Sequence, residues 1–221
     1  MKLHLGCGMR YLDGYTNIDF PISEQTVLAN VKADLFCDIN ALRYSPYSID
    51  EIRLHHVFEH FSRPVALALL CKWRDWLRPG GLLRIETPDA MACCKSLTRW
   101  FVSYDQKQQI LRHLFGSHEA AWAVHCDGWY KEKFSTTLSA LGYERLRFFR
   151  NSWGKLCNIE VQALKSDRNY DVQSYSEAVT RLLRSSTVRV RTQERDVPEG
   201  SEAEMLHVWK MAWENAYLGA E

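Results

Sequence analysis

Three histidines and a glutamate stand close together in the first third of the chain. His55, His56, Glu59 and His60 follow directly on an apolar run, and His125 lies much further along. Imidazole is the side chain that takes up a proton near neutral pH, so this group is suited to general base catalysis. We favour His56 as the base, because His60 would begin a helix and could simply cap it. His125 could reach over the same cleft or pack among its aromatic neighbours.

A glycine turn near the N-terminus predicts a ligand site. The apolar stretch that opens the chain ends in Gly6-Cys7-Gly8, and glycine lets a ligand approach the backbone closely. The dinucleotide fingerprint requires a further small residue three positions after the second glycine, where this chain has Tyr11. The connection to the next strand is also too short for a long helix that would bind a pyrophosphate. The turn therefore favours an adenosine ligand without phosphates, and a nicotinamide cofactor is disfavoured.

Strands and helices alternate around these residues. The alternation ends in two consecutive strands, which predicts an α/β sheet with one antiparallel edge strand. The expected strands cover residues 1–5, 15–20, 31–35, 49–56, 82–87, 143–150 and 158–164. The expected helices cover residues 64–77 and 131–141, one or two helical turns fit between the first two strands, and residues 23–30 form a short helix or a loop. A helical insertion is expected over residues 89–130, beside the ligand cleft.

The chain changes character after residue 165. Helical patterns cover residues 174–184 and 202–217, and residues 187–191 alternate like an exposed strand. We therefore expect one ligand-binding domain over residues 1–165 and a C-terminal appendage over residues 166–221. The appendage either forms a homodimer or covers the sheet. Its basic run is followed by an acidic one, which favours solvated or paired faces over nucleic-acid binding.

Composition narrows the function classes. The chain has 221 residues, 46% hydrophobic content and a formal net charge of +1, which suits one sizeable core and gives no bulk attraction to nucleic acid or anionic membranes. Seven cysteines without a C-x-x-C pair indicate reduced thiols, a cytoplasmic location and no metal site. No apolar run is long enough to span a membrane, and the N-terminus does not read as a signal peptide.

Several motifs in order resemble one enzyme family. They are Leu5-Gly6-Cys7-Gly8, Asn17-Ile18-Asp19, Asp38-Ile39, and the segments 50–60 and 77–85. Together they resemble the class I S-adenosylmethionine-dependent methyltransferases, specifically the small bacterial type 11-like enzymes, over residues 1–164. The resemblance implies a Rossmann-like class I methyltransferase fold with a mostly parallel seven-stranded sheet and one antiparallel edge strand. It also implies S-adenosylmethionine as the cofactor.

The resemblance assigns roles residue by residue. The glycine motif would meet the methionine part of the cofactor, Asp19 would accept both ribose hydroxyls, and Asp38 would accept from the adenine amino group. The cofactor residues implied in this way are Leu5, Gly6, Cys7, Gly8, Asp19, Phe20, Asp38, Ile39 and His55. The catalytic candidates are His56, His60 and His125.

The function that follows is methyl transfer to a hydroxyl of a small molecule or a glycan. The alternative is a non-catalytic S-adenosylmethionine-binding module that acts through its C-terminal helices as a partner or scaffold. Carboxylates in both cofactor positions favour the enzyme. The acceptor would be selected by residues 89–130 or by the appendage. The aromatic residues of the insertion are expected to be mostly core, with a platform for sugars as the other interpretation; they are Trp100, Phe101, Tyr104, Trp122, Trp129 and Tyr130.

Overall fold

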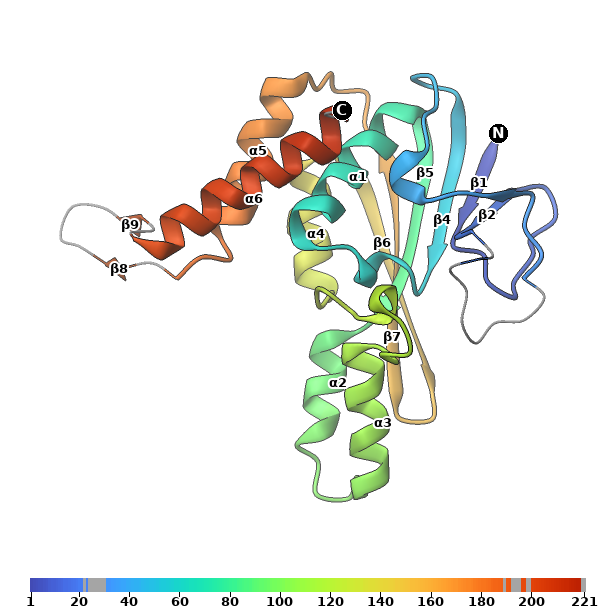
Figure 1. Cartoon of the computed structure of the whole chain (residues 1–221), viewed down its shortest axis with the longest axis vertical. Helices are drawn as coiled ribbons and strands as arrows, with labels where there is room; N and C mark the ends of the chain where they lie inside the picture. The colour runs from blue at the N-terminus through green and yellow to red at the C-terminus, as the bar shows by residue number, and fades with distance from the viewer. Residues whose placement is uncertain (22, 24–30, 189, 192–195, 198–199, 220–221) are drawn as a thin grey trace.

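A seven-stranded sheet carries the fold in the computed structural model, which describes residues 1–21, 23, 31–188, 190–191, 196–197 and 200–219. The strand order is β3-β2-β1-β4-β5-β7-β6 (Figure 1). The strands are β1 (Lys2–Leu5), β2 (Thr16–Asp19), β3 (Leu35–Phe36), β4 (Ile49–His55), β5 (Leu77–Pro88), β6 (Tyr143–Trp153) and β7 (Leu156–Lys165).

One strand of the sheet is reversed. The first five strands pair in parallel, whereas β7 is antiparallel to both of its neighbours, β5 and β6. The fold class expected from the sequence, a mostly parallel seven-stranded α/β sheet, is confirmed. The reversed strand is the inner member of the edge pair, because the β6–β7 hairpin folds back and places β7 against β5.

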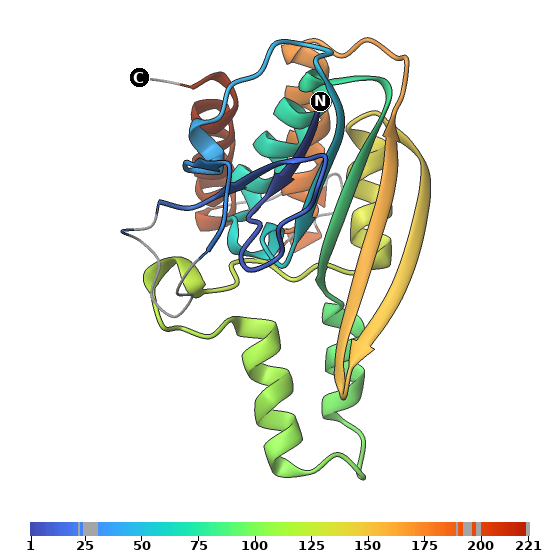
Figure 2. The ribbon, with the colours of Figure 1, turned by 90° about the vertical axis from the view of Figure 1, so that its right-hand side faces the viewer.

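The two faces of the sheet differ. Along β5, Leu83 and Ile85 are buried on one face, while Arg84 and Glu86 point to the other. Helices α1 (Arg63–Trp76), α4 (Lys131–Ala140), α5 (Val172–Arg184) and α6 (Ser201–Leu218) lie on the apolar face (Figures 1 and 2). The polar face carries a row of ion pairs across four strands, formed by Lys2, Glu51, Arg84 and Glu160.

The connection between β1 and β2 contains no helix, although one or two helical turns were expected there. Residues 6–15 form turns instead. The buried side chain of Asn17 holds them: its Oδ1 accepts from the Leu12 amide at 2.9 Å, and its Nδ2 donates to the Leu12 and Tyr15 carbonyls at 3.0 and 3.1 Å. The Asn17 side chain therefore makes the hydrogen bonds to backbone groups that other backbone groups would make in a helix.

The C-terminal helices share the core of the sheet domain. Helix α1 begins with Pro64 in its first turn and is buried on nearly all sides, because the sheet covers one side and α5 and α6 cover another. The buried guanidinium of Arg74 donates to the carbonyls of Gly142 and Ser166 and to the hydroxyl of Tyr175, at 3.2–3.3 Å. The expected division into a domain over residues 1–165 and a C-terminal appendage over residues 166–221 remains a prediction.

The insertion after β5 is helical, as expected. It contains α2 (Ala90–Leu97), α3 (Tyr104–Phe115) and the 3₁₀ turn η4 (Ala121–Ala123). The α2–α3 pair extends from one end of the sheet beside the β6–β7 hairpin (Figures 1 and 2). The hydrophobic core of the α2–α3 pair is small, so only some aromatic residues of the insertion are buried. Trp129 is buried against Phe58 and Phe134, whereas Trp100 is 92% exposed.

Two expected elements fall partly outside the described residues. Of residues 23–30, only residue 23 is described, and of the expected strand over residues 187–191, residues 190–191 form the short strand β8 (Val190–Arg191), which pairs with β9 (Asp196–Val197). Among the helices of the described ranges, none has the combined length and apolar character needed to cross a membrane.

Candidate active site

A pocket of about 790 Å³ opens at the carboxyl ends of β1, β2 and β4. Parallel strands bring their carboxyl ends to one edge of a sheet, which is where α/β folds place ligand sites. The volume lies in the range of small-molecule and cofactor sites. The pocket is lined by Gly6, Cys7, Gly8, Met9, Arg10, Asp19, Phe20, Asp38, Ile39, Asn40, His55, His56, Val57, His60, Phe61 and Trp122.

Two of the site residues expected from the sequence do not line this pocket. Leu5 is fully buried at the end of β1, so its side chain belongs to the core and its backbone alone remains near the turn. His125 comes from the insertion and lies next to His60, with ring centroids 4.6 Å apart. The other expected cofactor and catalytic residues line the pocket together.

The glycine turn has a backbone conformation that requires glycine. Gly6 has φ +65°, and a Cβ built there would lie 2.3 Å from Cγ2 of Val57. The amides of Gly6 and Cys7 both donate to the carbonyl of Ile18, at 2.8 and 3.1 Å. The turn is thereby fixed against β2, and its backbone faces the pocket without an intervening side chain.

Asp19 connects the end of β2 to this turn. Its Oδ2 accepts from the amide of Gly8 at 2.5 Å, and its Oδ1 accepts from the amide of Phe20 at 2.7 Å. Each carboxylate oxygen has a second lone pair, so the group can still accept hydrogen bonds from a ligand. Burial, and then the nearby Asp19 charge, raise the pKa of the Cys7 thiol to about 12, which leaves that thiol unreactive.

Asp38 and Ile39 form a further part of the pocket wall. Asp38 caps the 3₁₀ turn η2 (Ile39–Ala41), and its Oδ1 accepts from the backbone and side-chain nitrogens of Asn40 at 2.8 and 3.0 Å. Ile39 is almost buried, so it presents only a small apolar surface to the pocket. A carboxylate beside an apolar surface is a suitable contact for a flat ring that carries an amino group.

His56 is held between two carboxylates. Its Nδ1 lies 3.2 Å from Oε1 of Glu59 and its Nε2 lies 3.5 Å from Oε1 of Glu86. Burial alone would lower the pKa of His56, but the hydrogen bonds and charges of Glu59 and Glu86 outweigh burial and raise the pKa to about 9. The ring is therefore protonated at neutral pH, which does not fit the base role that the sequence favoured for it.

His55 is engaged by arginines. Its Nε2 accepts from Nε of Arg53 at 2.5 Å, and Nη1 of Arg10 lies 3.3 Å from its Nδ1. The bond from Arg53 uses the lone pair of the neutral ring. His55 is therefore suited to forming the pocket wall and not to accepting a proton.

His60 has the geometry of a proton acceptor. It belongs to the 3₁₀ turn η3 (Phe58–His60), and its Nδ1 lies 3.2 Å from the carbonyl oxygen of Val124. A carbonyl only accepts hydrogen bonds, so Nδ1 carries the proton and Nε2 keeps a lone pair. Burial lowers the pKa of the neighbouring His125.

Three charged or ionisable residues near the site were not predicted from the sequence. Arg10 follows the glycine turn, Glu86 lies near the end of β5, and His113 in α3 places its ring 5.6 Å from that of His56. The position of Glu86 near the end of a buried strand was a usable signal, since the neighbouring strand ends in His55. His113 stands in an amphipathic helix, and nothing in its spacing distinguishes it from a surface histidine.

Comparison with known proteins gives structural similarity alone. No family model and no curated protein matches the chain. A SAM-dependent methyltransferase from Methanosarcina mazei is similar over 75% of this chain and 92% of its own, at 14% identity and a TM-score of 0.48. A methyltransferase from Mesorhizobium loti is similar over 74% of this chain and 90% of its own, at 14% identity and a TM-score of 0.47.

A third similar structure contains bound ligands. It is the 1,6-didemethyltoxoflavin-N1-methyltransferase of Burkholderia thailandensis with 1,6-didemethyltoxoflavin and S-adenosylhomocysteine. The similarity covers 75% of this chain and 71% of that one, at 13% identity and a TM-score of 0.49. At these sequence identities and TM-scores, the structural similarity does not establish an activity for this chain.

Proposed function

We propose that this chain is an S-adenosylmethionine-dependent methyltransferase that acts on a hydroxyl of a small molecule or a saccharide. One observation carries the proposal: the glycine turn, Asp19, Asp38 and the histidines of residues 55–60 line a single pocket of about 790 Å³. Such a pocket combines a backbone cradle, two carboxylates on its walls and a group able to accept a proton.

Different pocket residues fit different parts of the cofactor. Asp19 can accept from both ribose hydroxyls, because each of its oxygens makes one backbone hydrogen bond and keeps a further lone pair. Asp38 and Ile39 would hold the adenine, with Phe20 beside it. The open backbone at Gly6 would face the methionine part, and the Arg10 guanidinium on the wall suits its carboxylate.

The chemistry that the cofactor supplies when bound is a methyl group on a positively charged sulfur. On transfer, the acceptor oxygen would gain the methyl group, and the cofactor would leave as a neutral thioether. The hydroxyl proton must go to a base. His60 is the candidate, because its Nε2 keeps a lone pair on the pocket wall, whereas His56 is already protonated.

Calorimetry with S-adenosylmethionine and S-adenosylhomocysteine tests the cofactor. We expect both to bind, and Asp19→Ala to weaken binding at least tenfold because the ribose loses its acceptor. The matched control is Asp105→Ala in the first turn of α3, away from the pocket. Absence of binding to the unaltered chain would contradict the proposal.

Transfer of a radiolabelled methyl group to a panel of monosaccharides and phenols tests the acceptor class. Turnover with one class would identify it, and His60→Ala should then lower kcat while leaving cofactor affinity within a factor of two. A chain that binds the cofactor but transfers no methyl group would favour the non-catalytic binding module.

A further inference from the structure

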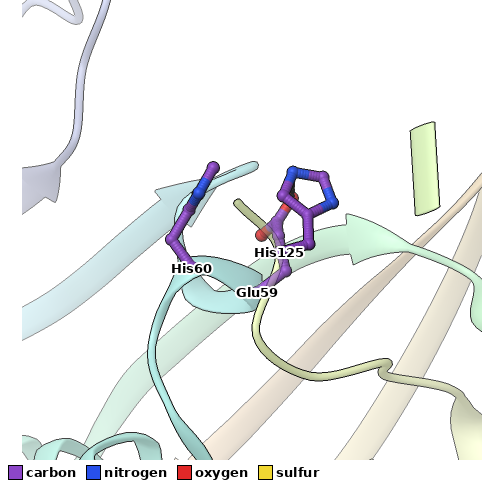
Figure 3. A group of neighbouring side chains, drawn as sticks. All are labelled: Glu59, His60 and His125. Carbon is purple, nitrogen blue, oxygen red and sulfur yellow. Dashed lines mark ion pairs between the residues drawn. The ribbon is translucent and has the colours of Figure 1, made fainter. Parts of the chain in front are cut away.

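Two histidines and a glutamate form a compact group at the end of the pocket. In the described part of the chain, one ligand atom each from Glu59, His60 and His125 lie within 4.8 Å of one another. Glu59 and His60 come from η3 and His125 from the segment after η4, and the three side chains project to the same side (Figure 3). His60 also lines the pocket, so the group borders the site described above.

The carboxylate of this group is buried and only half satisfied. Glu59 is 2% exposed; its Oε1 lies 3.2 Å from His56, and its Oε2 has no hydrogen-bond partner among the described residues. Nδ1 of His125 is likewise buried without a partner there. Leaving such atoms unpaired is expensive, and a native structure usually provides a partner, a water molecule or an ion.

The hydrogen bond of His60 prepares it for coordination. Its Nδ1 donates to the carbonyl of Val124, which fixes the tautomer with a lone pair on Nε2. Histidines that bind metals typically donate their other ring N–H to a carbonyl or carboxylate in this way. Glu59 has a similar supporting contact, because its Oε1 is hydrogen-bonded to Nδ1 of His56.

We propose that Glu59, His60 and His125 bind one divalent transition-metal ion of the Zn²⁺ type. Two imidazoles and one carboxylate are a donor set that Zn²⁺ uses in catalytic sites, where a fourth position stays open. Bonds of about 2.1 Å place ligand atoms roughly 3.4 Å apart, so a separation of up to 4.8 Å must close by up to about 1.4 Å, which side-chain rotation can provide. The sequence predicted no metal site, because its cysteines lack ligand spacing and these histidines lie far apart in the chain.

The position of the site suggests its role, which rests on the proposed function. Because His60 lines the pocket, an ion held by His60 would border the pocket and could bind the oxygen of the methyl acceptor there. Coordination lowers the pKa of a bound hydroxyl, so that the hydroxyl proton is released to solvent before the methyl group is transferred. In the metal-bound protein His60 is then a ligand and not a base. Metal binding itself does not depend on this role.

Titration of the full chain with Co²⁺, after removal of metals by a chelator, tests the site. We expect visible absorption to saturate at one Co²⁺ per chain. Glu59→Gln, His60→Ala and His125→Ala should each weaken binding at least tenfold. His207→Ala, on the exposed side of α6, is the matched control and should leave the affinity unchanged.

The adjacent cysteine provides a second control. Cys126 is exposed and follows His125 directly, so Cys126→Ser should retain the affinity and the spectrum should contain no thiolate charge-transfer band. No saturable Co²⁺ binding, or unchanged binding by a His60→Ala/His125→Ala double variant, would overturn the proposal, as would loss of binding in Cys126→Ser alone.

Binding of S-adenosylhomocysteine to the same samples separates the two proposals and reports folding of each variant. If it binds while Co²⁺ does not, the metal site is refuted and the proposed function is not. If Co²⁺ binds as described and S-adenosylhomocysteine does not, the metal site is supported and the methyltransferase proposal fails.

Discussion

Nδ1 of His4 donates a hydrogen bond to Oδ1 of Asn17 at 3.1 Å, between strands β1 and β2. Both residues are fully buried, and Nε2 of His4 has no partner among the described residues. Burial lowers the pKa of His4 to about 4, and the nearby Arg53 and Arg10 charges act in the same direction, while the Asn17 bond opposes them. The folded chain therefore holds this ring neutral.

Acid should destabilise the fold through His4. The unfolded chain takes up a proton near pH 6.5 and the folded chain only near pH 4, so the unfolded state binds more protons between these values. The free energy of unfolding should fall as pH falls through this window, by up to about 3 kcal/mol from this ring. Urea unfolding at several pH values between 4.5 and 7.5 measures the slope.

The variant His4→Leu isolates this contribution. Its unfolding free energy should vary less steeply over the same pH range than that of the unaltered chain, whatever its absolute value. His207→Leu, at an exposed position on α6, should retain the original slope. Equal slopes for the unaltered chain and His4→Leu would mean that His4 is protonated in the folded state.

Removal of the Asn17 side chain should destabilise the turns between β1 and β2. Asn17→Ala leaves the amide and carbonyl of Leu12 and the carbonyl of Tyr15 without their partner. The fully buried Nδ1 of His4 also loses its partner. We expect a loss of about 2–4 kcal/mol in unfolding free energy, because an unpaired buried group costs about 1–3 kcal/mol and the Leu12 and Tyr15 groups are partly buried. Gln173→Ala on the exposed surface of α5 is the control; a loss below 0.5 kcal/mol for Asn17→Ala would show that the turns hold without it.

Alanine at Gly6 should impair both stability and cofactor binding. A left-handed backbone costs a residue with a Cβ about 1–2 kcal/mol, and the new Cβ would also collide with Val57. Gly6→Ala should weaken S-adenosylhomocysteine binding at least tenfold by calorimetry. Adding Val57→Ala relieves the collision but not the backbone strain, so the double variant should recover affinity only in part. Unaltered affinity in Gly6→Ala would place the ligand away from this turn.

Arg74 should contribute much more to stability than an exposed arginine. Arg74→Met leaves the Gly142 and Ser166 carbonyls without their charged donor in a buried place. We expect a loss of about 2–4 kcal/mol in urea unfolding. Arg78→Met, which removes an exposed ion pair with Asp50, should cost at most about 1 kcal/mol. Similar losses for the two variants would contradict a structural role for Arg74.

Long periodic elements were predictable from the sequence. Residues 64–77 were expected as a helix, and α1 spans Arg63–Trp76, because Pro64 and the apolar spacing mark it clearly. The missing helix before β2 was not predictable, since it depends on Asn17, whose bonds to Leu12 and Tyr15 are visible only after folding. Trp100 was expected in a core for its residue type, but its two-helix arm is too small to bury it.

The pocket residues were predictable where each follows a strand. Gly6, Asp19 and Asp38 were placed by motif order, and all three line the pocket. The protonation of His56 was not predictable, because it depends on Glu86, which belongs to another strand and meets it only in the sheet. The group of Glu59, His60 and His125 likewise joins segments that are distant in the sequence.

The position of α6 has a consequence for synthesis of the chain. Tyr217 of α6 donates to the Asp75 carboxylate at the end of α1, as Tyr175 of α5 does. Residues 77–200 must be translated between the two helices, which takes about 6–25 s at 5–20 residues per second. During that interval the outer side of α1 lacks its cover on the ribosome. Nascent chains of this protein should therefore engage chaperones that bind apolar helices until residues 201–218 have emerged.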